Sequence, residues 1–421
     1  MDFNEFGFDE GLLEGIVSSG YKNPTPIQEQ VIPLIMQGKD LIASAQTGTG
    51  KTAAFLLPLI HLLISNKQDK HISGLIIVPT RELAIQIAQH MEGLSYFTDV
   101  SFISIYGGGD GNAFVEEKRA LINGVDLIIC TPGKMISHLN MGYVKLQHLK
   151  YLVLDEADRM LDMGFYDDIM KIITATSPAR QSLLFSATMP DRIRMLARKI
   201  LREPAEINIA LSKPAEKITQ QAYVVYEPQK QGLIFHLLKQ FQFRSVIVFC
   251  SRKQVVKQLT RDLKKAGLKA DEMHSDLEQA QREDVMTQFK ARTLPVLIAT
   301  DIVSRGIDIE DIDLVINYDV PHDGEDYVHR IGRTARASAS GMAITLISDS
   351  EQGRFGKIES LIQYVVQKMP IPESLGAGPE YAPHHKTSSG SKPHSGKKPP
   401  FKRNPNKKRP SHPKNPSPKS S

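Results

Sequence analysis

The stretch Ala45-Gln46-Thr47-Gly48-Thr49-Gly50-Lys51-Thr52 decides the fold class that we predict for this chain. It lies between an apolar, strand-like run at 41–43 and a helix-like run at 53–64. Small residues let backbone N–H groups surround phosphate oxygens at the positive end of the helix that follows. Lys51 would place its charge on the β- and γ-phosphates, and Thr52 would offer its hydroxyl to Mg²⁺. The stretch therefore predicts a phosphate-binding loop.

One position of this stretch departs from the general pattern, because Ala45 stands where glycine is usual. The alternative interpretation is a glycine-rich turn between a strand and a helix, without a ligand. The rest of the chain has to decide between the two.

Composition indicates two globular domains. The chain has 421 residues, of which 41% are hydrophobic, enough for two cores. Cys130 and Cys250 each end an apolar run, which favours buried strand residues in a reducing compartment over a disulfide or a metal site. The first residues lack the basic start and apolar stretch of a signal peptide, and no apolar segment is long enough to span a bilayer. We expect a soluble, cytoplasmic protein with no membrane partner.

The net charge of +5 is unevenly distributed along the chain. Residues 385–421 contain 11 Lys and Arg and no acid, whereas residues 1–384 contain 41 basic and 47 acidic residues, a formal charge of −6. A nucleic-acid site on the folded part must therefore be a local groove.

Strand and helix patterns alternate along the chain, which is typical of α/β proteins with doubly wound parallel sheets. We expect the functional residues in the loops after the strands, because ligands bind there in such sheets. The expected strands of the first half are 41–43, 74–78, 101–105, 125–130, 151–154 and 182–185; those of the second half are 222–225, 246–250, 296–299, 314–317 and 343–347.

The acidic run Asp155-Glu156-Ala157-Asp158 directly follows a buried strand. Asp155 fits the Mg²⁺ partner of phosphate-loop NTPases, and Glu156 fits the group that orients and deprotonates the attacking water. We expect Lys51 and these acids at two neighbouring strand ends. The alternative, an acidic helix N-terminus, is reasonable for Asp158, to which we assign interdomain hydrogen bonding.

Gln28 precedes the phosphate loop, in the stretch Tyr21-Lys22-Asn23-Pro24-Thr25-Pro26-Ile27-Gln28. A glutamine amide donates and accepts at once, so it matches the N6/N7 edge of adenine. The alternative is a glutamine that caps a helix.

With these residues in hand, the chain resembles the DEAD-box RNA helicases over residues 1 to about 367. The run Val153–Phe165 looks most like the bacterial RhlE-type branch. Further motifs occur in the family's order: Pro79-Thr80-Arg81-Glu82-Leu83-Ala84, Gly107-Gly108, Thr131-Pro132-Gly133-Lys134, Ser186-Ala187-Thr188, Ile247-Val248-Phe249-Cys250-Ser251, Ala299-Thr300-Asp301, Arg305-Gly306-Ile307-Asp308 and His329-Arg330-Ile331-Gly332-Arg333-Thr334-Ala335-Arg336.

The resemblance implies two tandem RecA-like domains, with ATP and Mg²⁺ as ligands and RNA as partner. It adds Ser186 and Thr188 as couplers between the nucleotide and the RNA, and we count Asp158 and His329 among the coupling residues as well. The nucleotide-binding residues would be Phe3, Gln28, Ala45, Gln46, Thr47, Gly48, Thr49, Gly50, Lys51, Thr52 and, on the ribose, Asp308.

The second half repeats the strand and helix alternation but has no phosphate loop. It contains Arg333 and Arg336, with His329 four residues before Arg333, and on a helix these three would share a face. Two arginines presented to a γ-phosphate form the arginine-finger arrangement. The alternative is a basic helix face paired with surface acids. With fingers on one domain and Lys51 on the other, hydrolysis would require closure of the two domains.

The resemblance places an RNA groove on the face opposite the nucleotide. Hydroxyls, N–H groups and cations suit phosphates and 2′-OH groups and carry no base code, so we expect sequence-independent binding. The expected lining residues are Arg81, Gly108, Thr131, Lys134, Arg282 and Thr300; the alternative for each is a solvated loop residue.

Two residues depart from the family pattern. Lys134 replaces an arginine, which keeps the charge but loses bidentate geometry. Ala335 replaces a glycine between the two fingers. Alanine is favoured if that position is helical, whereas a positive φ there would disturb finger placement.

We expect four segments along the chain. Residues 1–208 form the ATP-binding domain, 209–218 a linker, 219–368 the second domain, and 369–421 a disordered basic tail, rich in Pro, Ser and Lys. The tail is either a solubilising appendage or a nucleic-acid arm.

The leading functional hypothesis is an ATP-dependent RNA helicase that locally unwinds short duplexes and remodels ribonucleoproteins. A DNA-translocating ATPase would share the phosphate loop and fingers, though not obviously the Gln28 stretch. An ATP-gated RNA clamp would use the same residues without separating strands. We expect a monomer, with ribosomal or RNA-decay complexes as partners that the sequence does not name.

Overall fold

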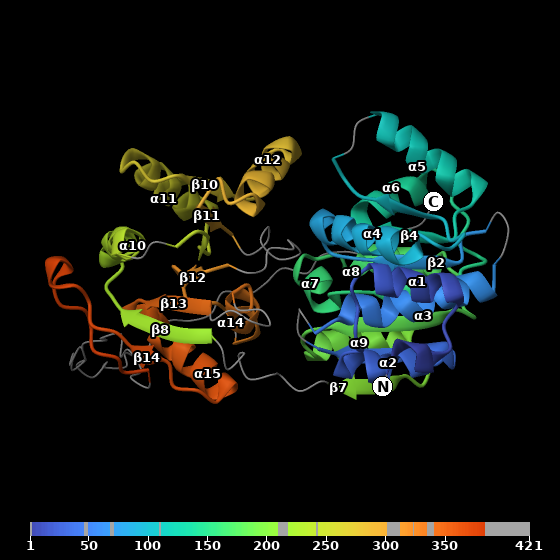
Figure 1. Cartoon of the computed structure of the whole chain (residues 1–421), viewed down its shortest axis with the longest axis horizontal. Helices are drawn as coiled ribbons and strands as arrows, with labels where there is room; N and C mark the ends of the chain where they lie inside the picture. Colours follow the sequence, from blue (N-terminus) through green and yellow to red (C-terminus); the bar gives the residue numbers. More distant parts are fainter. Residues whose placement is uncertain are drawn as a thin grey trace, which may run out of the picture. The chain divides into compact units, whose positions relative to one another are not determined.

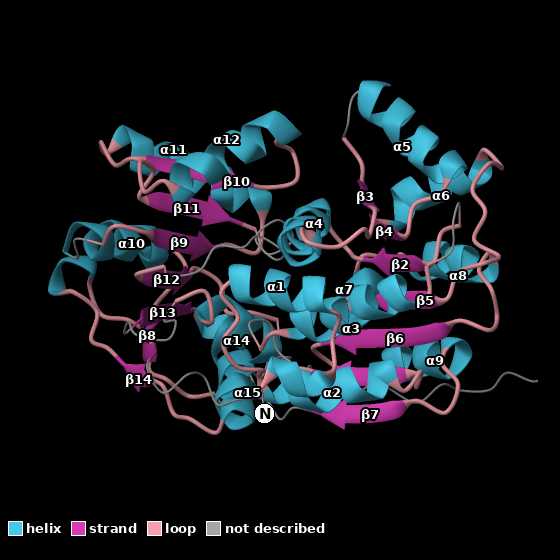
Figure 2. Ribbon diagram, turned by 45° about the vertical axis from the view of Figure 1, so that its right-hand side comes forward, coloured by secondary structure: helices cyan, strands magenta, loops and turns pink. Residues whose placement is uncertain are grey.

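The computed structural model of the chain describes residues 2–45, 49–67, 71–108, 111–208, 218–240, 243–300, 312–322, 324–334 and 341–383. Figure 1 shows its helices and strands, and Figure 2 separates helix from strand by colour. Two seven-stranded sheets contain the strands, one in each half of the chain. Within the described residues, the neighbouring strands of both sheets pair in parallel. The expected fold class, two doubly wound parallel sheets, is therefore confirmed.

The first sheet has the strand order β3-β4-β2-β5-β6-β1-β7. Its central strands are short, apolar and buried on both faces, as expected for a parallel sheet covered by helices. The strands are β1 (Leu41–Ser44), β2 (Gly74–Ile77), β3 (Phe102–Ile105), β4 (Leu127–Cys130), β5 (Tyr151–Leu154), β6 (Gln181–Ser186) and β7 (Ala205–Asn208).

Helices cover both faces of this sheet. One hydrophobic cluster joins the sheet to α1 (Glu10–Ser18), α2 (Pro26–Met36), α3 (Lys51–Ser65) and α4 (Arg81–Ser95), which follow the short 3₁₀ helix η1 (Phe3–Phe6). The other cluster joins it to α5 (Gly111–Asn123), α6 (Pro132–Asn140), α7 (Ala157–Asp162), α8 (Tyr166–Thr174) and α9 (Asp191–Ile200). The helix that follows the phosphate loop, α3, thus belongs to the layer packed by the first cluster.

Capping residues set the start of α2. Pro26 occupies its first turn, where a missing N–H costs nothing. Thr25 and Gln28 stand at the two positions of a capping box, in which the Gln28 side chain accepts a hydrogen bond from the Thr25 backbone N–H. Gln28 is therefore fixed at the beginning of a helix, next to the phosphate loop.

The second sheet has the strand order β10-β11-β9-β12-β13-β8-β14. The strands are β8 (Ile218–Val224), β9 (Val246–Phe249), β10 (Ala270–Met273), β11 (Val296–Ala299), β12 (Leu314–Asn317), β13 (Gly341–Ile347) and β14 (Gln367–Lys368). One cluster packs α10 (Gln229–Gln240) and α11 (Lys253–Lys265) against this sheet. Two others hold α12 (Gln279–Lys290), α14 (Gly324–Ile331) and α15 (Gln352–Ile362), and the short 3₁₀ helices are η2 (Asp349–Glu351) and η3 (Glu373–Leu375).

The structure adds strands that the hydrophobic pattern did not indicate. Strands β7, β10 and β14 lie at sheet edges. Strand β7 carries Glu206 between half-buried neighbours, and β10 carries two adjacent acids, Asp271 and Glu272, between buried residues, so neither resembles an apolar run. Edge strands are covered on fewer sides and therefore need fewer apolar residues.

Residues 369–383 differ from the sequence expectation of a disordered tail. Ile371 and Leu375 pack against one cluster of the second half, and Tyr381 against another. The Tyr381 hydroxyl also donates to Glu359 Oε2 over 2.6 Å. These anchors are too widely spaced to produce a periodic pattern in the sequence. The limits of the domains, including those of the 209–218 linker, stay predictions, and residues 384–421 lie outside the described residues.

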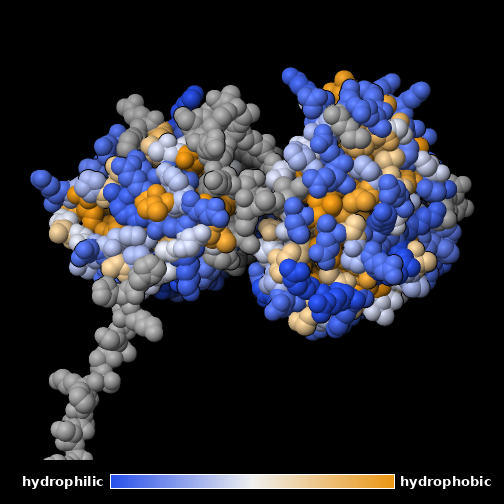
Figure 3. All heavy atoms as spheres, turned by 90° about the horizontal axis from the view of Figure 1, so that it is seen from below, coloured by the Kyte–Doolittle hydropathy of each residue, from blue (hydrophilic) through white to orange (hydrophobic). Residues whose placement is uncertain are grey.

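The described helices include none that is long and apolar enough to cross a membrane. In the space-filling view of Figure 3, hydrophobic residues gather in groups among hydrophilic ones on the face that is drawn.

Candidate nucleotide and RNA sites

The predicted nucleotide residues follow three adjacent strands of the first sheet. The phosphate loop follows β1, Ser186 ends β6 and Asp155 follows β5. Because the sheet is parallel, these three loops meet at one edge. The expectation that Lys51 and the acids occupy neighbouring strands is wrong, since β6 lies between β1 and β5. The intervening strand carries Ser186-Ala187-Thr188 into the middle of the site.

Lys51 begins α3, directly after Gly50, which has the left-handed φ of 91°. The Lys51 side chain is buried, and its Nζ donates to the Ala45 carbonyl over 2.7 Å. The Lys51 side chain thus reaches from the start of α3 back to Ala45, the first residue of the loop. Thr52 follows in the first turn of α3 and is half-buried. Gln46, Thr47 and Gly48 lie outside the described residues, and Thr49 is described.

Gln28 joins the start of α2 to the phosphate loop. Its Oε1 accepts from Thr25 N over 2.9 Å, and its Nε2 donates to the Gly50 carbonyl over 3.1 Å. A Cβ added to Gly50 would lie 2.6 Å from that Nε2. The capping interpretation of Gln28 is therefore confirmed, and the structure adds a contact with Gly50. Its role as an adenine reader stays a prediction.

Phe3 belongs to the core of the first half. Its ring is 3% exposed and lies 6.2 Å, centroid to centroid, from both Phe6 and Tyr21. Its assignment to the nucleotide stays a prediction.

Asp155 is a buried carboxylate beside other charges. It is 3% exposed, and its Oδ1 accepts from Glu156 N over 2.9 Å. Burial raises the pKa of Asp155 to about 6, and the charges of Glu156 and Asp158 act in the same direction, while Lys51 opposes the shift. The cluster therefore has more negative charge than Lys51 alone compensates.

Glu156 adopts an unusual backbone conformation, with a φ of 49° in the left-handed region. Such a conformation costs a non-glycine residue on the order of 1–2 kcal/mol. It directs the chain from β5 into α7, which starts at the next residue. Glu156 Oε2 lies 3.4 Å from Arg159 Nη1. Sequence reasoning gave Arg159 no role; its spacing of three residues from Glu156 was the available signal.

Asp158 connects the acidic run to the Ser186-Ala187-Thr188 motif. Its Oδ2 accepts from Thr188 N over 2.9 Å, and its backbone N–H donates to Ser186 Oγ over 3.3 Å. Ser186 Oγ in turn donates to the Thr188 carbonyl over 2.8 Å. The loops after β5 and β6 are thus tied together by one network. The sequence indicated interdomain hydrogen bonding for Asp158 and a coupling role together with Ser186 and Thr188; the structure adds these contacts within the first half.

The predicted RNA residues of the first half follow the other strands of the same sheet. Arg81 starts α4 after β2, Thr131 caps α6 after β4, and Gly108 follows β3. These strands are neighbours in the order β3-β4-β2. The expectation of an opposite face is therefore wrong for this sheet. The candidate nucleotide and RNA residues lie at the same carboxyl edge of this sheet. The RNA candidates follow β3, β4 and β2, and the nucleotide candidates follow β5, β6 and β1.

Arg81 and Gly108 lie against one another. The Arg81 guanidinium carbon is 5.1 Å from the centre of the Tyr106 ring. Gly108 has a φ of 92°, and a Cβ there would lie 2.1 Å from Arg81 Nη1. Position 108 therefore requires glycine for two reasons: its φ is positive, and Arg81 occupies the space that a side chain would need.

Lys134, in the first turn of α6, forms an ion pair with Glu117 of α5 at 3.0 Å. Its Nζ also lies 5.3 Å from the centre of the Phe114 ring.

In the second half, the structure describes only some of the predicted residues. Thr300 follows β11 and is 8% exposed. Arg282 lies on α12, where its Nη2 donates to the Ser275 carbonyl over 3.0 Å. Asp308, Ala335 and Arg336 lie outside the described residues, as do the segments 305–307 and 209–217.

The helical arrangement expected for His329 and Arg333 is wrong. His329 lies on α14, but that helix ends at Ile331, so Arg333 belongs to the following turn. Its carbonyl accepts from Ile312 N over 3.2 Å, and Thr334 bridges to Ile312. Gly332 ends the helix, a signal that the motif itself contained. The two side chains therefore do not share a helix face.

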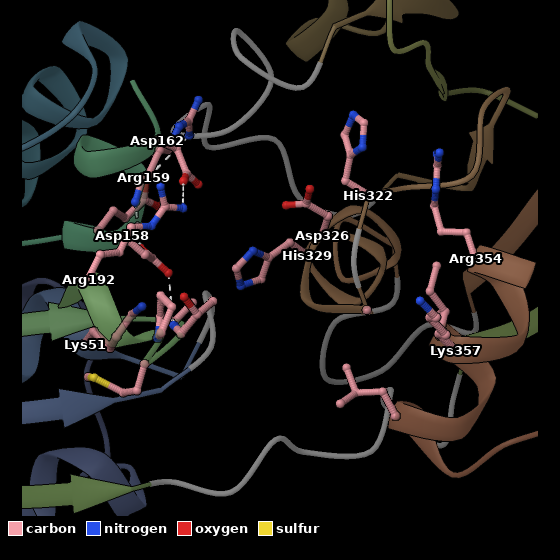
Figure 4. Close-up of a pocket in the computed structure, with 18 of the residues that line it drawn as sticks. Lys51, Asp158, Arg159, Asp162, Arg192, His322, Asp326, His329, Arg354 and Lys357 are labelled. Carbon is pink, nitrogen blue, oxygen red and sulfur yellow. Dashed lines mark hydrogen bonds and ion pairs between the residues drawn. The ribbon is translucent and has the colours of Figure 1, made fainter. Parts of the chain in front are cut away.

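Figure 4 draws side chains that line a pocket. From the first half it labels Lys51, Asp158, Arg159, Asp162 and Arg192; an ion pair joins Arg192 to Asp162. From the second half it labels His322, Asp326, His329, Arg354 and Lys357.

Two parallel sheets, the first with a phosphate loop and an acidic run at its carboxyl edge, define a phosphate-loop NTPase. Comparison with known proteins makes this class more specific. Residues 25–196 match the DEAD/DEAH box helicase family, and residues 229–338 match the helicase conserved C-terminal domain.

Full-length relatives agree with these matches. The chain is 43% identical over 371 residues to the ATP-dependent RNA helicase CshA of Listeria monocytogenes, which covers 88% of the chain and 70% of the relative. It is 39% identical to the DEAD-box ATP-dependent RNA helicase CshA of Geobacillus kaustophilus, with 88% and 78% covered. The chain therefore belongs to the DEAD-box family of ATP-dependent RNA helicases.

A solved structure supports the same fold. Dbp5 of S. cerevisiae, bound to RNA and ADP BeF3, aligns with a TM-score of 0.78 at 31% identity, over 88% of this chain and 95% of that one.

Proposed function

We propose that this ATP-dependent RNA helicase binds ATP at the edge formed by β1, β6 and β5, and binds RNA at the β2, β4 and β3 end of the same edge. The observation that carries this proposal is the Asp158, Ser186 and Thr188 network, which joins the acidic run to the loop after β6. A change at the phosphates could reach the Ser186-Ala187-Thr188 loop through these hydrogen bonds.

The residues of the first half have distinct tasks in this proposal. Lys51 leaves the Ala45 carbonyl and binds the β- and γ-phosphates, since a phosphate oxygen is a stronger acceptor than a carbonyl. Glu156 orients the attacking water and accepts its proton. Arg159, whose Nη1 lies 3.4 Å from Glu156 Oε2, holds that carboxylate in position.

The donor set of the site fits Mg²⁺. Asp155 is buried beside two further acids, and Thr52 offers a hydroxyl at the helix start. Among the described residues no group of three or more His, Cys, Asp or Glu is arranged to hold a metal, and magnesium bound with a nucleotide needs only one or two carboxylates besides the phosphates. Asp155 and Thr52 would hold the ion. When bound, it neutralises charge on the phosphates.

The second half would complete the reaction. Arg333 and Arg336 act as fingers on the γ-phosphate, His329 couples them to the first half, and Asp308 contacts the ribose. ATP would stabilise a closed arrangement of the halves, because it binds residues of both. Closure on a bent strand, gripped by Arg81, Gly108, Thr131, Lys134, Arg282 and Thr300, would separate a few base pairs.

Finer assignments rest on the sequence. The relatives from Listeria monocytogenes and Geobacillus kaustophilus carry the name CshA, and placement in the RhlE-type branch rests on the run Val153–Phe165. A cytoplasmic location, a monomeric state and work on ribosomal or RNA-decay complexes are proposals of the same kind. An ATP-gated clamp without strand separation is the second candidate function, since it would use the same residues.

ATP hydrolysis by the full chain, measured with single-stranded RNA and with DNA of the same sequence, tests the proposal. We expect stimulation by RNA and little by DNA, because 2′-OH contacts distinguish them. Equal stimulation by both would identify a DNA-tolerant translocase instead.

A further inference from the structure

The pairing of Lys134 with Glu117 bears on how the RNA groove is charged. The two side chains are 16% and 8% exposed, and Lys134 Nζ lies 3.0 Å from Glu117 Oε2. Glu117 comes from the middle of α5, whereas Lys134 starts α6. Lys134 is the position at which the chain departs from the arginine of its family.

His138 holds the acid in place and is itself held by two aromatic side chains. His138 is fully buried, and its Nε2 lies 3.0 Å from the same Glu117 Oε2. The other ring nitrogen of His138 contacts the Tyr143 hydroxyl, and the ring stacks on Phe114 with centroids 4.9 Å apart and planes 11° apart. Glu117 Oε2 therefore faces both His138 Nε2 and Lys134 Nζ within a packed cluster.

Charge in this cluster is compensated by Lys134. Burial lowers the pKa of His138, so the imidazole is neutral near pH 7 and donates to Glu117 as a neutral group. The positive charge opposite Glu117 is the Lys134 ammonium. A phosphate that approaches Lys134 therefore meets a cation already paired with an acid.

We infer that Glu117, held by His138, positions Lys134 and reduces the contribution of Lys134 to RNA phosphate binding. The inference rests on the proposed RNA groove and deepens it. An arginine could bond to Glu117 and to a phosphate through different N–H groups, because its planar fork has five donors. Lysine has a single ammonium group, so its one charge is shared between Glu117 and the phosphate.

The variant Glu117→Gln tests this inference. Glutamine keeps an oxygen that accepts from His138 but removes the charge that pairs with Lys134. We expect RNA affinity of the full chain to rise about fivefold at low salt, the size of a partly exposed ion pair. The log–log salt slope should steepen by about 0.7, one further phosphate contact.

Glu116→Gln is the matched control. Glu116 is exposed and lies next to Glu117 on the same helix. Its substitution removes the same net charge. We expect it to change RNA affinity by less than about twofold, because an exposed charge is screened. An equal effect of the two variants would show a general charge effect and overturn the inference.

The double variant Glu117→Gln/Lys134→Ala controls for a folding defect. It removes both charges of the ion pair, so neither is left without its partner. We expect it to lose the affinity that Glu117→Gln gains, because the ammonium released from Glu117 is no longer present. An affinity as high as that of Glu117→Gln alone would show that the gain does not come from Lys134, which contradicts the inference. RNA stimulation of ATP hydrolysis by the unaltered chain reports separately on the proposed function.

Discussion

At the scale of single residues, the site combines groups whose burial or backbone conformation has a cost in the ligand-free fold. Asp155 is buried with two acids beside it, and Glu156 has a left-handed φ. Both features are explained if their partners are phosphate, cation and water. Substitutions at these positions should therefore affect function and stability differently.

Lys51→Ala should abolish ATP turnover by removing the phosphate contact, whereas Glu156→Gln should keep ATP and RNA binding and stall hydrolysis, because it loses only the proton acceptor. Nucleotide binding and single-turnover hydrolysis measure the two effects. Normal turnover by the Gln variant would remove Glu156 from the mechanism.

Asp155→Asn should raise the melting temperature of the ligand-free chain, because it removes a buried carboxylate that is disfavoured by desolvation. The same variant should lose the stabilisation that the unaltered chain gains from ATP with Mg²⁺. Thermal unfolding with and without the nucleotide measures both. A lower melting temperature without ligand would show that Asp155 stabilises the fold.

Sequence reasoning at this scale worked best for residues with a fixed spacing. Lys51, Asp155 and Glu156 could be found because their motifs require particular residue types beside one another. Glu117, His138 and Tyr106 could not, since their roles depend on contacts between helices and loops that no local pattern encodes.

At the scale of elements, the start of α3 depends on the start of α2. The Gln28 amide holds the Gly50 carbonyl, and Gly50 has no room for a side chain. The two segments are therefore one unit, although 22 residues separate these contacts.

Gly50→Ala should weaken ATP binding strongly, because its Cβ would collide with Gln28 Nε2 and the residue has a φ of 91°. Gly38→Ala is the matched control: its φ is 75°, but nothing lies within 4 Å of the added Cβ. We expect the control to lose about 1 kcal/mol of stability from strain alone and to bind ATP normally. Equal loss of ATP binding in both would assign the effect to backbone strain.

The strand pattern also shows where sequence reasoning ends. The buried central strands were found because parallel strands covered on both faces are continuously apolar. The edge strands β7, β10 and β14 were missed because they mix polar with apolar residues. The order of the strands, which puts β6 between Lys51 and Asp155, is a long-range property. The end of α14 at Ile331 was indicated by Gly332 but not recognised.

At the scale of the whole molecule, the charges of the core and the tail are opposite. Residues 1–384 have a formal charge of −6, and residues 385–421 have 11 cations and no acid. Such an arrangement favours a tail that increases RNA affinity without taking part in the chemistry.

Deleting residues 385–421 should weaken RNA binding and flatten its salt dependence. If about five cations contact phosphates, the log–log slope should fall by about 3.5, at roughly 0.7 per single-strand contact. ATP turnover at saturating RNA should stay nearly unchanged, because all residues assigned to chemistry precede the tail. An unchanged slope would reduce the tail to a solubilising segment, and a collapse of saturated turnover would mean that the second domain extends beyond residue 384.

The central claim is that ATP drives local separation of RNA strands through closure of two halves on one RNA. The most direct measurement is release of a labelled strand from short RNA duplexes of increasing length, with and without ATP. We predict ATP-dependent release that declines steeply with duplex length, because closure opens only a few base pairs at a time. Stable, ATP-dependent RNA binding without release from any duplex would contradict the claim and identify a clamp.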